Sequence, residues 1–429
     1  MDNYVKVAVR IKPLTSSEKE EEAAVHWKTK ASSYIYPVAD PSNIYTFSHA
    51  FTEKDDNEVI YSKFCSPVVQ SAVKGFNGAI IAYGQVSSGK TFTMMGDDDI
   101  KIEGIIHFSV YDLFKLIENN FDRIYFIRIA CLEIHKGKIS RDLLCDSNEF
   151  LPIQEKNDRI NRPLLTRYTV QEPQDVFNFI KEAQKKRETK STLKTENSSG
   201  SSLVIDLLIE SGPMKVEEEN EAELSHLLFL DPTENSDFQP NEIVSISNKR
   251  QKLLMQPKEV ARYLANNKGK SQFIIPQDTP ILEIYENILG GNFVTAIICT
   301  ISPTNLHETY AYLEIATLAR SIQNKPVSTR IISNNVQLVR YVNQLAQLIR
   351  KMQTAERWNH HQCRDIEIKL MRLQKFWRFH FLCTCQAKYF LKEKISGSSK
   401  GLRWRKSLPQ QPFIYRFCTH ATYEPKKRV

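Results

Sequence analysis

Short apolar runs alternate with stretches of helical periodicity over the first 325 residues of the chain. This alternation is typical of an α/β fold, in which helices flank a central, mostly parallel sheet. The predicted strands are Val5–Val9, Ala79–Tyr83, Tyr125–Ile134, Leu203–Ile209, Leu227–Leu230 and Val294–Ile301. The predicted helices are Glu58–Lys74, Pro173–Lys186, Pro257–Asn266 and Glu308–Ile322. We therefore expect one α/β domain over residues 1–326.

A different apolar pattern follows Pro326. Its positions are spaced by four, three, four and three residues, which matches the a and d positions of about two heptads. These positions are Leu338, Val342, Leu345, Ile349 and Met352. They predict a short neck helix over residues 336–356, joined to the domain by a linker over residues 327–335. The helix is a candidate homodimer contact, and residues 357–429 are expected to form a helical or disordered tail.

Charge divides the 429-residue chain unevenly, although its formal net charge is only +8. From Asn335 to the C-terminus there are 20 Lys and Arg against five Asp and Glu, whereas the preceding residues hold 38 against 45. The tail is thus strongly basic and the predicted domain is acidic. A basic tail favours an acidic partner such as nucleic acid, an anionic membrane or an acidic protein surface, and a solvated extension is the alternative.

Composition narrows the class of protein further. A content of 41% hydrophobic and 25% charged residues excludes a collagen-like or wholly disordered chain. No apolar run approaches the roughly 18 residues of a membrane helix, and the charged start does not read as a secretory signal. We expect an intracellular protein that uses no membrane and whose eight scattered cysteines are reduced thiols.

The strand Ala79–Tyr83 runs directly into the clearest chemical motif of the sequence. The motif, Gly84-Gln85-Val86-Ser87-Ser88-Gly89-Lys90-Thr91, satisfies the pattern G-x-x-x-x-G-K-[ST]. Glycines in such a loop let backbone N–H groups surround phosphate, Lys90 neutralises phosphate oxygens, and Thr91 offers its hydroxyl to magnesium. The order of strand, loop and helix favours phosphate binding over a chance match.

A phosphate-transfer site also needs an acid on the magnesium side, at the end of a neighbouring strand. Asp231 follows the strand Leu227–Leu230 and is the candidate, with the capping of a turn as the alternative role. The serine-rich segment Asn197–Ser202 leads into the next predicted strand upstream. Alone it would be an ordinary polar loop, but its order between the other two elements makes it a candidate sensor of the phosphate.

Together these segments resemble the motor domain of the kinesins over about residues 4–330. The resemblance is carried, in order, by VKVAVRIKPL, YTFSHAF, AYGQVSSGKTFTMMG, LEIHKGKISRDLL, RETK with the NSSGSS loop, SHLLFLD, LGGNFVTAIICTISP and ETYAYLEIATLARSIQNKP. The segments WKT, AYGQ and AIICTISP are most similar to the centromere-associated kinesins. The resemblance implies a P-loop NTPase fold, ATP and magnesium as cofactors, ATPase activity, and movement on microtubules.

The resemblance also implies roles for individual residues. The loop Gly84–Thr91 would bind the ATP phosphates and magnesium, and Ser199 would be the switch serine that senses magnesium. The residues beside the adenine would be Arg10, Lys12, Pro13 and Phe92.

The two switch loops depart from the kinesin pattern. Kinesins have an Arg where this chain has Gly200, and Asp-Leu-Ala-Gly-Ser-Glu where it has Asp231-Pro232-Thr233-Glu234-Asn235-Ser236. Glu234 then replaces the glycine that donates to the γ-phosphate, and Ser236 replaces the Glu that pairs with the missing Arg. A one-residue insertion would instead place Asn235 at the glycine. Positioning supplies most of the catalysis in phosphoryl transfer, so these changes predict slow hydrolysis.

The track-binding side departs as well. An ungapped alignment places Gln277, Pro280 and Glu283 at three basic positions of the kinesin stretch that precedes LGGN. Two functions are therefore predicted: a microtubule motor driven by ATP, and a nucleotide-binding pseudo-motor that acts as a microtubule or spindle scaffold. If the protein holds a microtubule, its tail is the expected contact. The expected location is the cytoplasm and cytoskeleton, with the spindle or kinetochore as a narrower expectation.

The tail allows two further readings. Aromatic residues among its Lys and Arg would suit single-stranded nucleic acid, but packing within the protein is favoured, so nucleic acid is not the expected partner. The tail also holds side chains of the kinds that bind zinc, without the usual spacing of a zinc finger. These residues are His360, His361, Cys363, Cys383 and Cys385.

Overall fold

The computed structural model describes residues 4–85, 87–135, 139–145, 165–191, 201–214, 221–231 and 287–354. The described chain up to Ser333 belongs to one compact unit, and helix α10 (Asn334–Thr354) belongs to a second. A helix is thus present where the a/d pattern predicts one. The tail and the predicted helix Pro257–Asn266 lie outside the described residues.

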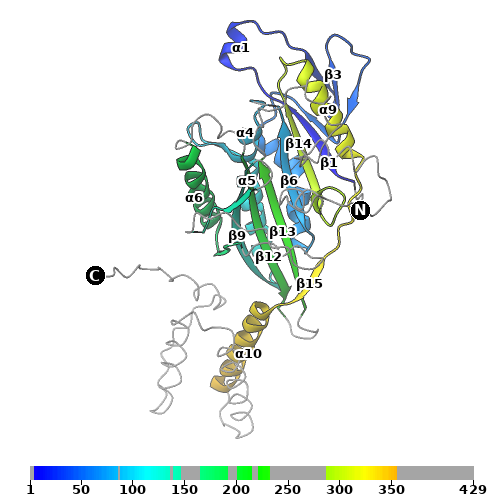
Figure 1. Ribbon diagram of the computed structural model, residues 1–429. Helices are drawn as coiled ribbons and strands as arrows, with labels where there is room; N and C mark the ends of the chain where they lie inside the picture. The colour runs from blue at the N-terminus through cyan, green and yellow to red at the C-terminus, as the bar shows by residue number, and fades with distance from the viewer. Residues whose placement is uncertain are drawn as a thin grey trace, which may run out of the picture. The chain divides into compact units, whose positions relative to one another are not determined.

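A ten-stranded sheet runs through the first unit (Figure 1). Its main strands follow the order β10-β9-β12-β13-β6-β14-β1-β5, with β11 paired to β9 and β15 to β13. The strands are β1 (Lys6–Ile11), β5 (His49–Phe51), β6 (Gly78–Gly84), β9 (Arg123–His135), β10 (Ile139–Asp142), β11 (Tyr168–Val170), β12 (Ser201–Pro213), β13 (Glu221–Asp231), β14 (Val294–Ile301) and β15 (Thr329–Ile332). All six predicted strands are found in this sheet.

The sheet is flanked by helices as expected, but its strands are mixed in direction rather than mostly parallel. The strands β5, β1, β14, β6 and β13 are parallel, whereas β12, β9, β10, β11 and β15 join the sheet antiparallel. Residues 214–220 alone connect β12 to β13, and residues 136–138 alone connect β9 to β10. Parallel neighbours need a connection of about a dozen residues or more, so these short connections impose hairpins.

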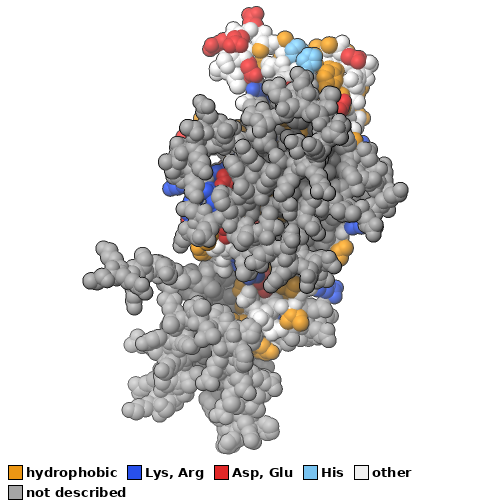
Figure 2. All heavy atoms as spheres, in the orientation of Figure 1, with side chains coloured by type: hydrophobic (Ala, Val, Ile, Leu, Met, Phe, Trp, Pro, Cys, Tyr) orange, Lys and Arg blue, Asp and Glu red, His pale blue; other side chains and the backbone are white. Residues whose placement is uncertain are grey.

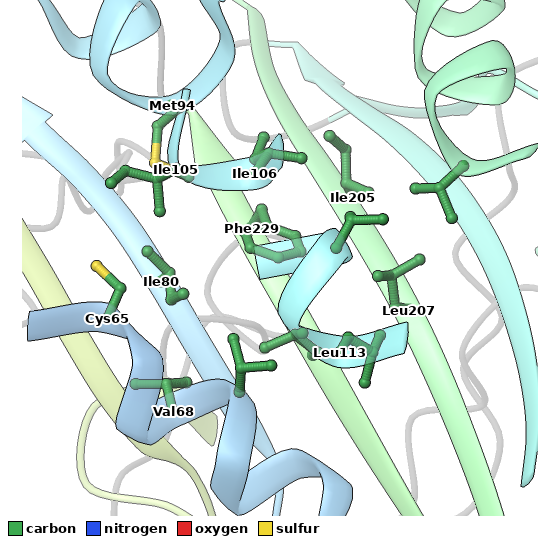
Figure 3. Close-up of a cluster of buried hydrophobic side chains, with 14 of the residues drawn as sticks. Cys65, Val68, Ile80, Met94, Ile105, Ile106, Leu113, Ile205, Leu207 and Phe229 are labelled. Atoms are coloured by element: carbon green, nitrogen blue, oxygen red, sulfur yellow. The ribbon is translucent and has the colours of Figure 1, made fainter. Parts of the chain in front are cut away.

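Helices on one face of the sheet cover the larger apolar core. These are α2 (Asn57–Ile60), the π-helix η1 (Tyr61–Cys65), α3 (Ser66–Val73), α5 (Ile105–Glu118) and α6 (Pro173–Ser191). Ile80 and Phe229 of the strands and Leu113 of α5 belong to one cluster of buried side chains (Figure 3). Each of these three side chains is at most 1% exposed, and burial of one such side chain contributes about 1.5–3 kcal/mol. The predicted helix Glu58–Lys74 is confirmed, with a π-helical turn in its middle.

The opposite face carries helix α9 (His307–Arg320), which lies against β1 and β14, together with a small three-stranded sheet. The strands of the small sheet are β2 (Trp27–Lys30), β3 (Tyr34–Pro37) and β4 (Tyr45–Thr46). Trp27 is 1% exposed, and its ring centroid lies 4.8 Å from that of Tyr310 of α9. Its Nε1 donates to the carbonyl of Asn305 at 3.2 Å, so one side chain fastens the small sheet to α9.

The chain that leaves α9 is hydrogen-bonded to the body of the unit. The N–H of Val5 donates to the carbonyl of Ile322 at 3.0 Å, and the N–H of Lys325 donates to the carbonyl of Gly291 at 2.8 Å. The segment is therefore tied both to the chain that enters β1 and to the turn before β14.

The predicted linker then adds a strand to the sheet. Strand β15 pairs antiparallel with the first residues of β13. Beyond it, the hydroxyl of Ser333 donates to the carboxylate of Glu210 in β12, which is 3% exposed. The second carboxylate oxygen of Glu210 accepts from Arg128 Nη2 at 2.7 Å. The end of β15 is thus held by a side-chain contact as well as by backbone pairing.

Charge is unevenly placed on the described surface. In the view of Figure 2, acidic side chains gather over α1 (Ser16–Glu20), and Lys and Arg side chains gather over α6.

Among the described residues, no helix combines the length and apolar character that a membrane span requires. The four cysteines in this part of the chain, Cys65, Cys131, Cys145 and Cys299, are free thiols.

Candidate phosphate-binding site

The loop between β6 and α4 (Lys90–Met95) has the backbone that the glycine motif predicts. Gly89 precedes the helix with φ +93°, and a Cβ built there would meet no heavy atom within 4 Å in the described structure. Gly84 is needed for a different reason, because a Cβ on it would lie 2.0 Å from the carbonyl oxygen of Thr300. Close packing on one side and open space on the other form a cradle of the kind that a phosphate group fills.

The loop is also held by side chains. Ser88 Oγ donates to the carbonyl of Gln85 at 2.7 Å and lies 2.7 Å from Thr300 Oγ1 of β14. The side-chain oxygen of Gln85 accepts from Thr309 Oγ1 of α9 at 3.0 Å. The loop is therefore fixed by contacts to two elements that are distant from it in sequence.

The predicted cation and magnesium-side groups meet at the start of α4. Lys90 is 7% exposed, and its Nζ donates to the carbonyls of Gly84 at 3.0 Å and Gln85 at 2.8 Å. Thr91 Oγ1 donates to Asp231 Oδ2 at 3.0 Å. The parallel pairing of β13 with β6 brings this carboxylate to the loop. A hydroxyl and a carboxylate side by side are oxygen ligands of the kind that magnesium prefers, so the residues present fit the predicted metal.

Arg10 lies inside the fold, where it joins three elements. Its Nη1 donates to Asn57 Oδ1 and to Thr93 Oγ1, each at 2.6 Å, and its guanidinium lies 5.4 Å from the ring centroid of Phe92. Burial lowers the pKa of Arg10 to about 10, although Asp56 and Asp55 act to raise it. Arg10 is therefore charged at neutral pH, and its described contacts position α4 beside β1 rather than reach outward.

The other residues predicted beside the adenine follow β1. Lys12 pairs with Glu18 of α1 at 3.2 Å, and Pro13 is exposed. Hydrogen bonds to Glu18, first of all from the backbone N–H of Thr15, lower its pKa to about 2. Glu18 is therefore a carboxylate at neutral pH and an effective partner for Lys12.

Three predicted site residues cannot be placed. Val86, Ser199 and Glu234 lie outside the described residues, and so do Gly200, Asn235 and Ser236 of the departing switch loops. The roles given to them stay predictions. The structure thus brings together the loop, Lys90, Thr91 and Asp231. The candidate zinc ligands of the tail are also outside the described residues, among which no group of three or more His, Cys, Asp or Glu side chains could hold a metal ion.

Sequence reasoning missed the residues that support the site. Asn57 and Thr93 hold Arg10, Thr300 holds Ser88, and Thr309 holds Gln85. Each is a single polar side chain at a buried position of a helix or strand. A polar residue on an otherwise apolar face of a helix or strand could have marked each of them as a supporting residue. The sequence does not show which distant residue such a side chain contacts.

The glycine motif between β6 and α4, the carboxylate of Asp231 beside it and the helix-flanked sheet are the features of the P-loop NTPase fold of the α/β class. A family model described as "Kinesin motor domain" matches residues 10–322. The chain therefore belongs to the kinesin motor family.

Individual relatives agree with this family. The human (Homo sapiens) "Centromere-associated protein E" is 31% identical over 82% of this chain and 13% of its own length. "Kinesin-like protein KIN-7L" of Oryza sativa subsp. japonica is 30% identical over 81% of this chain and 57% of its own length. "Kinesin-related protein 4" of Dictyostelium discoideum is 27% identical over 83% and 19%. The predicted likeness to the centromere-associated kinesins is confirmed, and the chain spans only part of each relative.

A solved structure shows the same fold. It is described as "Structure of a fast kinesin: Implications for ATPase mechanism and interactions with microtubules". The TM-score is 0.63 at 24% identity, and the match covers 77% of this chain and 95% of that one. At this identity the likeness supports the kinesin motor fold alone.

Proposed function

We propose that this chain binds ATP with magnesium at Gly84–Thr91 and works as a microtubule motor. The observation that supports the proposal is the hydrogen bond of 3.0 Å between Thr91 and Asp231, because it joins a hydroxyl and a carboxylate, oxygen ligands of the kind that magnesium prefers, near the open space at Gly89. Bound magnesium would neutralise charge on the β- and γ-phosphates. Ser199 is proposed to complete its ligand set.

The residues of the chain itself position the phosphates. The ammonium of Lys90 would exchange the carbonyls of Gly84 and Gln85 for phosphate oxygens, at a site 7% exposed where its charge is poorly screened. Arg10 and Phe92 would hold α4 in place beneath the loop and its nucleotide. Lys12 and Pro13 are proposed to border the adenine.

Nucleotide binding is tested with a fluorescent ADP analogue, with magnesium and with EDTA. Thr91→Ala should weaken binding in magnesium at least about 10-fold, because a hydrogen bond to a charged group is worth about 1.5–3 kcal/mol and the metal loses a ligand. The same variant should bind like the wild type in EDTA. Thr46→Ala removes an exposed threonine of β4 and is the matched control. Loss of affinity that is equal in magnesium and EDTA would contradict the assignment of Thr91.

A second candidate function, the nucleotide-binding pseudo-motor, is favoured by the switch departures at Gly200, Glu234 and Ser236. The two functions differ in turnover. A motor should show ATP hydrolysis that microtubules stimulate well above the basal rate. Nucleotide binding without such stimulation would support the pseudo-motor, and absence of nucleotide binding would exclude both.

We also propose partners and a location. The kinesin family supports association with microtubules and the cytoskeleton, and the centromere-associated relative supports the spindle or kinetochore. The a/d pattern of α10 supports a homodimer, which light scattering of the full chain tests. Because residues 335–429 carry 20 Lys and Arg, cosedimentation of the chain with microtubules should weaken steeply as the salt concentration rises. Binding that salt does not affect would count against a role for the tail.

A further inference from the structure

Gln85 is held by hydrogen bonds to its main chain and to its side chain. Its main-chain carbonyl accepts from Ser88 Oγ at 2.7 Å and from Lys90 Nζ at 2.8 Å, both within the phosphate loop. Its side-chain oxygen leaves the loop and accepts from Thr309 Oγ1 at 3.0 Å. Gln85 is 2% exposed and Thr309 is fully buried, so this hydrogen bond is shielded from water.

A bound phosphate would act on these two attachments differently. An ammonium has three N–H donors, and Lys90 now directs two hydrogen bonds at the carbonyls of Gly84 and Gln85. If Lys90 turns toward a phosphate, the hydrogen bonds that change are those to these main-chain carbonyls. The contact to Thr309 lies on the side chain of Gln85 and does not compete with phosphate. It can hold Gln85 in place while Lys90 turns.

We propose that Thr309 is a positioning residue for the nucleotide: through Gln85 it holds the phosphate loop in the conformation that accepts phosphate. It does not touch the ligand. The inference rests on the proposed binding of ATP at this loop, and it adds a specific residue on α9, 224 positions away in sequence, that sets the affinity.

The hydroxyl of Thr309 is not needed for the packing of α9. The packing of α9 on β1 and β14 is supplied by apolar side chains such as Leu313 and Ala316, which are at most 1% exposed. The hydroxyl of Thr309 has one other described contact, at 3.5 Å from the carbonyl of Ser302. Valine keeps the shape of threonine, so Thr309→Val removes the contact to Gln85 and leaves the helix packed.

The test compares three substitutions in α9 and the loop. Thr309→Val should weaken binding of the fluorescent ADP analogue in magnesium about 10-fold, as expected for one lost buried hydrogen bond that leaves its partner unsatisfied. Thr309→Ser keeps the hydroxyl and should restore binding to within about two-fold of the wild type. Gln85→Met should weaken binding similarly, and the double variant Gln85→Met with Thr309→Val should be no weaker than Gln85→Met alone.

The matched control is Thr317→Val, which removes a hydroxyl from the same helix. Thr317 Oγ1 donates to the carbonyl of Leu313 at 2.8 Å and has no described contact with the loop. This variant should bind nucleotide like the wild type, even if its melting temperature falls. Binding by Thr309→Val within two-fold of the wild type, or single effects that multiply in the double variant, would overturn the proposal.

A second measurement separates this inference from the proposed function. Without nucleotide, hydrogen exchange of the amides of residues 84–90 should be about 10-fold faster in Thr309→Val than in the wild type, and unchanged in Thr317→Val. If the wild type binds no nucleotide, the proposed function fails and this measurement alone decides whether Thr309 positions the loop. Equal exchange rates in Thr309→Val and the wild type would refute its role.

Discussion

Asp206 is a carboxylate in the middle of β12, and its replacement gives the sharpest test of how this sheet is stabilised. It is 6% exposed, accepts from Arg167 Nη2 at 2.7 Å, and lies 2.9 Å from His226 Nδ1 of β13. Burial alone would raise the pKa of Asp206, but His226 and Arg167 outweigh burial and lower that pKa well below its usual range. Asp206 is therefore ionised at neutral pH.

Asp206→Asn keeps the size of the side chain and removes its charge. Loss of one partner from a buried ion pair costs about 3–5 kcal/mol, because the remaining charge is left uncompensated. The side chain of Arg167 is 20% exposed and keeps some hydration, so we expect the low end of this range, about 3 kcal/mol. At the typical unfolding entropy per residue, this lowers the melting temperature of a unit of this size by about 4 °C.

The assay is equilibrium unfolding by urea over a range of pH. Since the folded pKa of Asp206 is lower than the unfolded value of about 3.9, the charge stabilises the protein above about pH 4. This contribution is lost as the pH falls further. The difference in unfolding free energy between wild type and Asp206→Asn should thus shrink as the pH falls below about 4. Asp122→Asn, at an exposed position, should change stability by less than about 0.5 kcal/mol. A difference below 0.5 kcal/mol for Asp206→Asn, or one that grows in acid, would refute the reasoning.

The remaining predictions concern β15 and the two loop glycines. Glu210→Gln weakens the contact to Ser333 and should speed hydrogen exchange of residues 329–332 about 10-fold, a change that is absent if backbone pairing alone holds the strand. Gly84→Ala places a Cβ 2.0 Å from a carbonyl oxygen and should destabilise the protein by more than about 3 kcal/mol in urea unfolding. Gly89→Ala meets no neighbour among the described residues and should cost only about 1–2 kcal/mol for its backbone angle, so equal losses for the two glycines would contradict the packing described here.

Local patterns predicted the loop and the strands well. The loop after β6 follows from contiguous residues, because the glycines and the adjacent buried strand act over a few positions. Helix α6 continues to Ser191, five residues beyond the predicted end at Lys186, since Lys, Arg and Glu are good helix formers. The antiparallel pairing of β12 with β13 was not predicted, since apolar runs reveal strands and only the length of their connection reveals a hairpin.

The partners of the site residues could not be predicted. Arg10 contacts Asn57 and Thr93, which are 47 and 83 residues away, and Gln85 contacts Thr309, which is 224 residues away. Such pairs depend on the order of the strands in the sheet, and the local patterns of a single sequence do not predict that order. The switch predictions at Ser199 and Glu234 lie outside the described residues and stay predictions.

The end of β15 also determines how mechanical load enters the sheet. The chain passes from β15 through Ser333 into α10, so a pull on that helix arrives at the Ile332 end of the strand. When a strand is pulled from one end, its backbone hydrogen bonds break one after another. The four residues of β15 pair with β13 over a short length, so this pairing alone offers little resistance. The hydrogen bond from the Ser333 hydroxyl to the carboxylate of Glu210 lies at this end of the strand. Arg128 donates to the other oxygen of the same carboxylate and so holds it in place. A pull on α10 would therefore meet this side-chain contact as well as the backbone pairing before the strand could peel away.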